Sequence, residues 1–318
     1  MSWELILPFL RPIEPLLLDP DISDILVNGA ASVFIEKQGR LQAMPEIAMS
    51  ERFLQVAVRN IARVLGDDVS PDKPLLDARL PDGSRVAAVL APCSVTGTTL
   101  AIRKFHGGRF TAESLVIRGM LPVEVMQRLR EAVEDRRNIL ISGGTGTGKT
   151  TLLAALAGFI PAEERIVVIE DTSEIRIEVP DLVRLEARRE QPGVSAVTLR
   201  DLLRTTLRLR PDRILLGEVR GGEAFDLLQA LNTGHSGALS TLHANSAGQA
   251  IARFTSCVLQ SGIELPYRAI RSQIGEALNV LVHIERRQGE RQVTQVLGLS
   301  AYEGALDRYQ LDTIYERR

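Results

Sequence analysis

The sequence predicts an α/β fold with a mainly parallel sheet, preceded by a smaller α+β N-terminal domain. In the second half of the chain, short apolar runs such as Ile139–Ile141 and Ile166–Ile169 alternate with helical stretches, which is typical of buried parallel strands joined by helices. In the first half, shorter strand-like runs are separated by turn residues. The length of 318 residues suits about two domains, which we place at 1–104 and 121–318 with a linker at 105–120.

The first domain is expected to contain short strands, hairpins and one long helix. Turn residues at Asn28-Gly29, Gln38-Gly39 and Pro81-Asp82-Gly83 separate runs that have strand character. Ser50 is in position to cap a helix over 51–66. The side chains expected on the apolar face of this helix are Phe53, Val56, Ile61 and Val64.

The expected linker, 105–120, follows the strand TTLAIRKF and has weak patterning. Its glycines, Gly107, Gly108 and Gly119, suggest a hinge between domains. A helix is expected to start with Pro122 in its first turn and to lead directly into the next strand. Its expected apolar face consists of Val123, Met126, Leu129 and Val133.

The segment NILISGGTGTGKTT, from Asn138 to Thr151, contains the clearest functional signal. It combines an apolar strand, the pattern G-x-x-x-x-G-K-[ST] and a following helix, which is the context that a phosphate-binding loop requires. Glycines let backbone N–H groups turn toward an anion, and the helix directs its positive dipole end at the same point. Lys149 is expected to reach the β- and γ-phosphates of a nucleotide, and Thr150 to hold Mg²⁺. The expected nucleotide-binding residues are Gly143, Gly144, Thr145, Gly146, Thr147, Gly148, Lys149, Thr150 and Thr151.

Acidic residues follow two further predicted strands. Glu170, Asp171 and Glu174 come at the end of the strand RIVVI, and Glu218 ends the strand ILLG. In open α/β sheets ligands bind beyond the carboxyl ends of the strands, so these acids are expected to face the nucleotide. An ATPase with a phosphate loop needs an acid on a neighbouring strand to place Mg²⁺ or the attacking water, and Glu218 is in that position.

Two histidines, His235 and His243, lie in a glycine-rich turn and in the strand after it. A single histidine is more often structural, but a pair near the nucleotide is a candidate for sensing polar groups. Their spacing does not resemble a helical zinc motif, and Cys93 and Cys257 lie far apart, so no zinc site is expected.

The remaining elements are expected to be helices and one hairpin. The segment TLRDLLRTTLRLR reads as a helix before the strand ILLG. Helices are expected at about 247–260 and 266–278, and the hairpin is expected to turn near Gln288-Gly289.

Composition limits the classes of function. Lys and Arg total 38 against 40 Asp and Glu, so the net charge is −2 and the overall balance does not predict a nucleic-acid binder. No run of about 18 apolar residues is present, so no membrane-spanning segment is expected. The N-terminal stretch 2–21 is apolar but contains charges and prolines, and we interpret it as the first helix of a domain, with membrane contact as the alternative.

Four ordered motifs carry a family resemblance. The segments GGTGTGKTT, IEDTSEI, LRTTLRLRPDRILLGEVRG and NTGHSGALSTLHANS resemble the Walker A, Asp box, Walker B and His box of the secretion ATPases of type II and type IV systems, and DISDILVNG and LAIRKF extend the likeness into the N-terminal half. The sequences of these motifs are most similar to those of the conjugal-transfer branch, the TrbB-like ATPases of type IV secretion. Tad-type pilus ATPases are similar in the same places. The tetracysteine zinc insert of type II secretion ATPases is absent.

The resemblance implies a fold, an assembly and residue roles. Such proteins are similar in having a P-loop (RecA-like) ATPase domain after an N-terminal domain, and in forming hexameric rings that bind ATP and Mg²⁺ between the two domains. Glu218 matches the Walker B glutamate that orients or deprotonates the attacking water, and His243 matches the sensor of the γ-phosphate. Glu170 and Glu174 match the acids near Mg²⁺, and Arg103 matches an arginine that reaches the phosphates when the domains close.

The Walker B segment departs from many ATPases in one position. Gly217 precedes Glu218 where many ATPases have an Asp-Glu pair, which moves the expected metal placement toward Thr150 and the Asp box. His235 lies at the start of the His box. Further candidate arginines, for which a solvated surface position is an equal alternative, are Arg85, Arg208 and Arg220.

The function implied is a cytoplasmic homohexameric ATPase, peripheral to the inner membrane, that powers type IV secretion in pilus biogenesis or substrate transfer. Its expected partners are inner-membrane components of the machine. A Tad-type pilus assembly ATPase and a DNA-translocating motor are alternatives, but direct nucleic-acid binding is not expected, since aromatic residues make up 4% of the chain. The intact motif residues Lys149, Thr150, Glu174, Glu218 and His243 argue against a non-catalytic scaffold.

Overall fold

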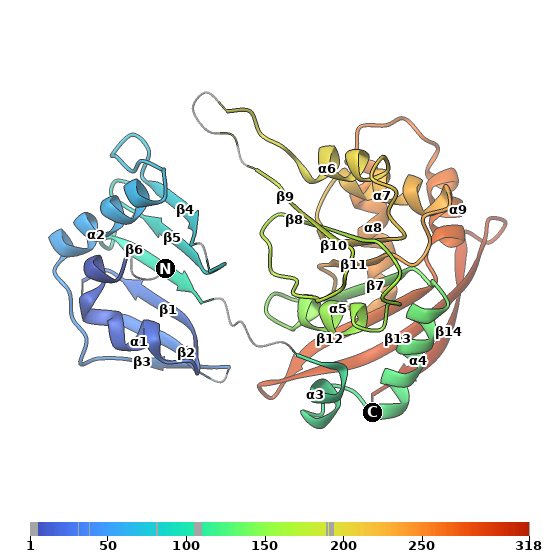
Figure 1. Ribbon diagram of the computed structural model, residues 1–318, viewed down its shortest axis with the longest axis horizontal. Coiled ribbons are helices and arrows are strands. Elements are labelled where there is room, and N and C mark those ends of the chain that lie inside the picture. Colours follow the sequence, from blue (N-terminus) through green and yellow to red (C-terminus); the bar gives the residue numbers. More distant parts are fainter. Residues whose placement is uncertain are drawn as a thin grey trace. The chain divides into compact units, whose positions relative to one another are not determined.

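The chain folds into two compact units, Met1–Gly108 and Arg109–Arg318, each with its own sheet and its own buried core (Figure 1). The structure is a computed structural model. Four residues named above, Gln38, Pro81, Gly107 and Gly108, and the first five of the chain lie outside the described residues. The described residues are 6–30, 32–37, 39–80, 82–104, 110–188, 190 and 194–317.

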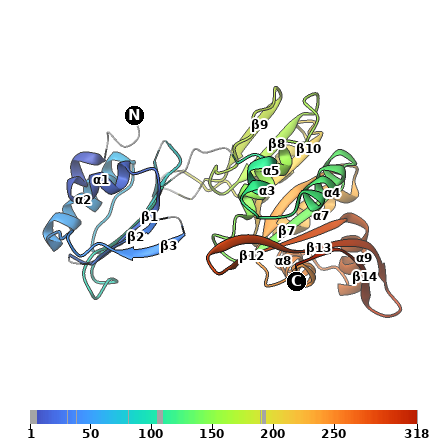
Figure 2. The same cartoon turned by 90° about the horizontal axis from the view of Figure 1, so that it is seen from below.

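The first unit is a six-stranded sheet in the order β3-β2-β1-β6-β5-β4, in which all neighbouring strands are antiparallel. Figure 2 shows α1 (Glu14–Leu18) and α2 (Glu51–Val64) on one side of this sheet. As predicted, Ser50 caps α2, and its side chain accepts a hydrogen bond from the backbone nitrogen of Phe53 (3.1 Å). The strands are β1 (Ile22–Asn28), β2 (Val33–Lys37), β3 (Arg40–Ala43), β4 (Leu75–Arg79), β5 (Arg85–Val89) and β6 (Thr99–Arg103).

The buried face of α2 differs from the one predicted. Leu54, Val58 and Ile61 are fully buried, whereas Val56 and Val64 are exposed. Buried positions on a helix recur at intervals of three or four residues, and the predicted stripe combined residues from two faces.

The apolar N-terminal stretch packs into the core of the first unit. Ile6, Leu10 and Ile13 are fully buried, which supports the interpretation of this stretch as part of a domain. In the described part of this stretch only α1 is α-helical, and two 3₁₀ turns, Leu7–Phe9 and Arg11–Ile13, precede it. A proline at the first or second position of each of these three elements favours short turns over one continuous helix.

The second unit is built on an eight-stranded sheet in the order β14-β13-β12-β7-β11-β10-β8-β9. The strands from β12 to β9 are parallel, and β13 and β14 are antiparallel, so the predicted mainly parallel sheet is confirmed. The hairpin turn at Gln288-Gly289 is also confirmed, whereas β9 and β14 have no counterpart among the predicted strands. The strands are β7 (Ile139–Gly143), β8 (Ile166–Glu170), β9 (Leu182–Glu186), β10 (Arg213–Val219), β11 (Leu239–Leu242), β12 (Val280–Arg287), β13 (Glu290–Glu303) and β14 (Arg308–Glu316).

Helices cover both faces of this sheet and form two cores, one with α6 to α9 and one with α3 to α5. Leu140 and Leu281 belong to the first core and Ile141 and Val282 to the second, so β7 and β12 are buried on both faces. Among the described residues, no helix is long and apolar enough to cross a bilayer. The helices are α3 (Ala112–Ile117), α4 (Val123–Glu134), α5 (Lys149–Ala157), α6 (Leu199–Thr206), α7 (Glu223–Asn232), α8 (Ala247–Leu259) and α9 (Tyr267–Ala277).

Helix α3 lies within the range 105–120 that the sequence predicts as a linker. Ala112 and Leu115 are buried in the core that also contains α5, so the end of this range is part of the second unit. In α4, Val123 is exposed rather than buried as predicted, and Val125 contributes to the core.

The amino ends of three parallel segments are joined by the buried side chain of Asn138. Its Oδ1 accepts hydrogen bonds from the backbone nitrogens of Gly237 (2.8 Å) and Ala238 (3.0 Å). Its Nδ2 donates to the carbonyl oxygen of Ala277 (2.6 Å). The chain segments that enter β7, β11 and β12 are therefore held together at one edge, and the strands end at the opposite edge.

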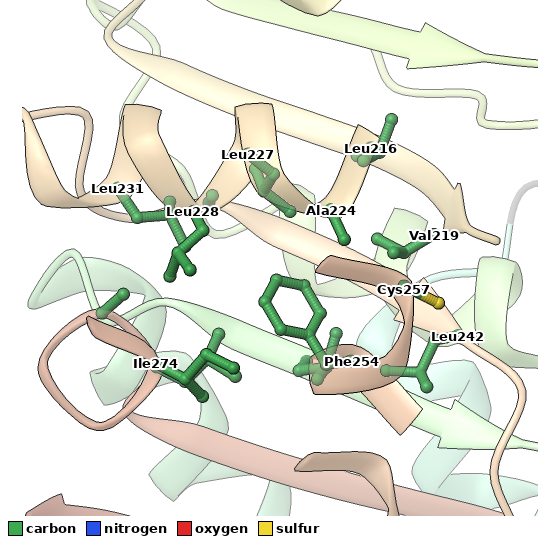
Figure 3. Close-up of a cluster of buried hydrophobic side chains, with 14 of the residues drawn as sticks. Leu216, Val219, Ala224, Leu227, Leu228, Leu231, Leu242, Phe254, Cys257 and Ile274 are labelled. Carbon is green, nitrogen blue, oxygen red and sulfur yellow. The ribbon is translucent and has the colours of Figure 1, made fainter. Parts of the chain in front are cut away.

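Phe254→Ala is expected to lower the free energy of unfolding by about 3–5 kcal/mol, because the ring is fully buried and its removal leaves a cavity. Figure 3 shows this ring of α8 facing Leu227 and Leu228 of α7. On the same helix Leu259 is 47% exposed, and Leu259→Ala should cost less than about 1 kcal/mol. Urea unfolding followed by circular dichroism measures both values. Equal losses in the two variants would contradict this packing.

Candidate nucleotide-binding site

Four parallel strands end at the same edge of the second sheet, and polar residues lie at each end. β7 continues into residues 143–148, β8 ends at Glu170, Glu218 is next to last in β10, and His243 follows β11. Leu242 pairs with both Ser142 and Val219, so the ends of β7, β11 and β10 are level. Three motifs that are separate in the sequence therefore meet in the fold.

Residues 143–148, which we call the phosphate loop, connect β7 to α5. Gly146 (φ 71°) and Gly148 (φ 98°) have left-handed backbone conformations that favour glycine. Gly148 is also the N-cap of α5, so the unpaired N–H groups of the first helical turn point toward the loop. Residues 144–146 are exposed, and Thr150 and Thr151 are half-buried in the first turn of α5. This geometry favours binding of an anion such as phosphate.

Gly143 is in close contact with the neighbouring strand β12. A Cβ atom at this position would lie 2.4 Å from the carbonyl oxygen of Ile284 and 2.8 Å from Oγ1 of Thr147, so a larger residue does not fit. The hydroxyl of Thr147 donates to the carbonyl oxygen of Gly144 (2.9 Å). β12 and Thr147 therefore fix the beginning of the phosphate loop.

Lys149 is buried and folds over its own loop. Its Nζ donates to the carbonyl oxygens of Gly143 (3.1 Å) and Gly144 (2.8 Å). Burial lowers the pKa of Lys149, and the charge of Glu218 opposes this shift. The amino group thus lines the inner side of the loop, where oxygens of a bound phosphate could take the place of the two carbonyls.

Glu218 lies between two other polar side chains. Its Oε2 accepts hydrogen bonds from Nε (2.8 Å) and Nη2 (2.5 Å) of Arg220, and Nη1 of Arg220 lies 3.0 Å from Oδ2 of Asp171. Its buried Oε1 lies 2.5 Å from Nε2 of His243. A carboxylate held beside an imidazole at the edge of a phosphate site is a candidate to accept a proton from water.

His243 is partly exposed beside the phosphate loop. Burial lowers its pKa, the positive charge of Lys149 lowers it further, and Glu218 acts in the opposite direction. The imidazole is therefore expected to be neutral at neutral pH, and it can donate one hydrogen bond to a phosphate oxygen.

Glu170, only 3% exposed, closes the loop that follows β8. Its Oε1 accepts hydrogen bonds from the backbone nitrogens of Glu174 and Ile175, both at 2.8 Å. Burial raises the pKa of Glu170 to about 7, against the effect of these two hydrogen bonds. A Cβ at Gly217 would lie 3.0 Å from Cγ of Glu170. The Gly217-Glu218 sequence is therefore explained by the packing of Glu170 against β10.

The oxygen ligands at this edge fit Mg²⁺ bound together with phosphate. Thr150 supplies a hydroxyl and the exposed Glu174 a carboxylate, which are the ligand types that Mg²⁺ prefers. Glu170 is less accessible, because its Oε1 is bound by two backbone N–H groups and its Oε2 lies 3.9 Å from Nη2 of Arg184. Within the described ranges, no three His, Cys, Asp or Glu side chains form a metal site. A metal ion here would depend on phosphate oxygens.

Of four further candidates, two lie at the opposite edge of this sheet and two belong to the first unit. His235 precedes β11 and Arg208 precedes β10, so both are at the amino edge of the sheet, opposite the phosphate loop, and the predicted histidine pair is wrong. Arg103 and Arg85 belong to the first unit, where they are paired residues of β6 and β5. Nε of Arg103 donates to Oδ1 of Asp24 (2.9 Å).

Sequence reasoning misses one polar pair below the phosphate loop. Oγ of Ser142 lies 2.9 Å from Nδ1 of His283, and both side chains are buried. The available signal is a polar residue inside each of two apolar strands, ILIS and VLVHI. Their pairing depends on the neighbouring positions of β7 and β12 in the sheet, which the local sequence does not indicate.

Glu170→Gln should make stability less dependent on pH. The pKa of Glu170 is about 7 in the folded protein, above its usual 4.5, so the folded state binds more protons between these values. The wild type should lose up to about 3 kcal/mol relative to the variant as pH rises from about 5 to about 8. Glutamine keeps an acceptor for the two backbone N–H groups. Urea unfolding of both proteins at the two pH values measures this difference, and a constant difference would contradict the prediction.

Comparison with known proteins finds relatives that match most of this chain. The family model described as type II/IV secretion system protein matches residues 10–299. The type IV secretion system protein PtlH of Bordetella pertussis is 37% identical over 307 residues, covering 88% of this chain and 90% of PtlH. The conjugal transfer protein TrbB of Rhizobium radiobacter is 33% identical over 287 residues, covering 89% of this chain and 85% of TrbB.

A solved structure gives the same result. The VirB11 ATPase from the Brucella suis type IV secretion system, in complex with sulphate, is 32% identical with a TM-score of 0.50, and the match covers 92% of this chain and 97% of that chain. The predicted resemblance to TrbB-like proteins of type IV secretion is thereby confirmed. The motif order, the mainly parallel sheet and these matches show that this chain belongs to the type II/IV secretion system protein family.

Proposed function

We propose that this chain is a Mg²⁺-dependent ATPase that powers type IV secretion. The observation that best supports the proposal is that the phosphate loop, Glu218 and His243 lie at one edge of the second sheet. The names of PtlH and TrbB connect relatives to secretion and conjugal transfer. The VirB11 structure is described as an ATPase in complex with sulphate, an anion similar in shape to a phosphate group.

The proposed reaction assigns one task to each polar group. Lys149 and the N–H groups at the start of α5 bind phosphate oxygens. Oε1 of Glu218 accepts a proton from the attacking water, and His243 donates a hydrogen bond to the γ-phosphate. Mg²⁺, held with Thr150 and Glu174, would supply positive charge at the phosphates.

The assembly that we propose is a homohexamer at the cytoplasmic side of the inner membrane, where it would bind membrane components of a secretion or pilus machine. The two units would act as domains, and different affinities of their conformations for ATP and ADP would drive the motion. Pilus biogenesis, including the Tad type, and substrate transfer are both within this proposal. Stimulation of turnover by DNA, with a steep inverse dependence on salt, would instead support a DNA motor.

Glu218→Gln should lower ATP turnover by roughly 10²- to 10⁴-fold with little change in nucleotide affinity, because the amide cannot accept the proton. Release of phosphate in the presence and absence of Mg²⁺ measures turnover, and titration with fluorescent ADP measures affinity. Glu264→Gln changes an exposed carboxyl of the same unit and is the control. Normal turnover by the Glu218 variant would rule out this role, and failure of the wild type to hydrolyse ATP would rule out the proposed function.

Arg103→Ala should lower turnover by about 10³-fold and affinity much less, if Arg103 supplies positive charge to the phosphates in the transition state as we propose. Arg59→Ala serves as the control, because Arg59 is an exposed residue on α2 of the same unit. Turnover and affinity are measured as for Glu218. Equal losses of turnover and affinity would identify Arg103 as a binding or structural residue.

A further inference from the structure

A chain of three polar residues runs beneath the phosphate loop. Oγ of Ser142 lies 2.9 Å from Nδ1 of His283 and 3.0 Å from the carbonyl oxygen of Val282. On the other side of the ring, Nε2 of His283 lies 3.4 Å from Oε1 of Glu285. Ser142 and His283 are 0% and 2% exposed, whereas the side chain of Glu285 is 35% exposed. The chain therefore connects the solvent with the interior of the sheet.

These three polar residues lie next to the phosphate loop. Ser142 is the residue before Gly143, and it pairs directly with His283 across the parallel strands β7 and β12. The next pair is Gly143 and Ile284, where the carbonyl oxygen of Ile284 leaves no room for a side chain. A change in the hydrogen bonding of His283 therefore acts on the strand that positions the start of the loop.

The hydrogen atoms in this chain can be counted. The Ser142 hydroxyl has a single hydrogen, which can go either to the carbonyl of Val282 or to Nδ1 of His283. A neutral imidazole has one N–H group, so it cannot donate to both Ser142 and Glu285. Only a doubly protonated ring donates to both residues while Ser142 donates to Val282. The network is complete only when His283 carries a positive charge.

Burial and nearby charges both affect the pKa of this ring. Burial lowers the pKa of His283, Glu285 raises it, and Arg287 and Lys149 lower it. On β13 the residue paired with His283 is the neutral Gln295. Helix α8 packs against β12, and its Arg253 lowers the pKa of His243. Of these charges, that of Lys149 is the one that a phosphate group in the loop would neutralise.

We propose that His283 is a positioning residue for the phosphate loop, and that it takes up one proton from solvent when an anionic phosphate binds at Lys149. Neutralising Lys149 removes a repulsion, so the protonated ring then completes its hydrogen bonds to Ser142 and Glu285. The proton enters along the exposed side of Glu285. This inference rests on the proposed nucleotide binding, but not on hydrolysis.

Calorimetric titration with Mg²⁺-ADP, in buffers of different ionisation enthalpy, counts the protons taken up on binding. The wild type should take up a fraction of a proton near pH 7, and its affinity should fall by up to about tenfold per pH unit as pH rises. His283→Gln, which cannot be protonated, should lose the part of this uptake and of the pH dependence that comes from His283, whereas any part that comes from His243 should remain. Glu285→Gln removes the carboxylate charge that stabilises protonated His283. This variant should therefore show a smaller proton uptake and a weaker pH dependence of affinity.

His243→Gln is the matched control, because His243 also lies near Lys149. Uptake that disappears in His243→Gln and persists in His283→Gln would overturn the proposal, as would binding without proton uptake in the wild type. The latter result would leave the proposed function intact, whereas no binding of ADP would refute both. Thermal unfolding of each variant without nucleotide checks folding. If His283→Gln does not fold, an unchanged proton uptake in Glu285→Gln overturns the proposal.

Discussion

The contact between β12 and the first glycine of the phosphate loop is the constraint on which the second unit depends. The carbonyl oxygen of Ile284 occupies the space that a side chain at position 143 would need. β7 also pairs with β11, so the loop, His283 and the residues before His243 are held at the same level of the sheet. Asn138 fixes the same three strands at their other end. The loop is therefore held by long-range pairing as well as by its own glycines.

The site is assembled from equivalent positions on parallel strands. Each strand contributes one group at its carboxyl end, and the groups are close enough to affect each other's protonation. The charge of Lys149 lowers the pKa of both His243 and His283. The charge of Glu218 raises the pKa of Lys149 and of His243. An anion in the phosphate loop would consequently change several protonation equilibria at once.

Features with a local physical cause could be predicted from the sequence. The phosphate loop, the cap at Ser50 and the turn at Gln288-Gly289 depend on residues that are neighbours in the chain. Some errors are local, such as the buried face of α2, and others concern features that depend on the whole sheet. His235 and His243 do not form a pair, because His235 precedes β11 and His243 follows it. The two ends of a strand lie at opposite edges of the sheet. The contact of Ser142 with His283 likewise requires knowledge of the strand order.

The packing of Glu170 against Gly217 limits which side chains fit at position 217. The two residues lie on adjacent strands, and the space beside Gly217 is filled by the methylene groups of Glu170. A carboxylate at position 217, as in the Asp-Glu pair of other ATPases, would compete for this space with a side chain that also holds the loop after β8. Positions 170 and 217 therefore form one packing unit, in which a side chain added at position 217 would require Glu170 to move.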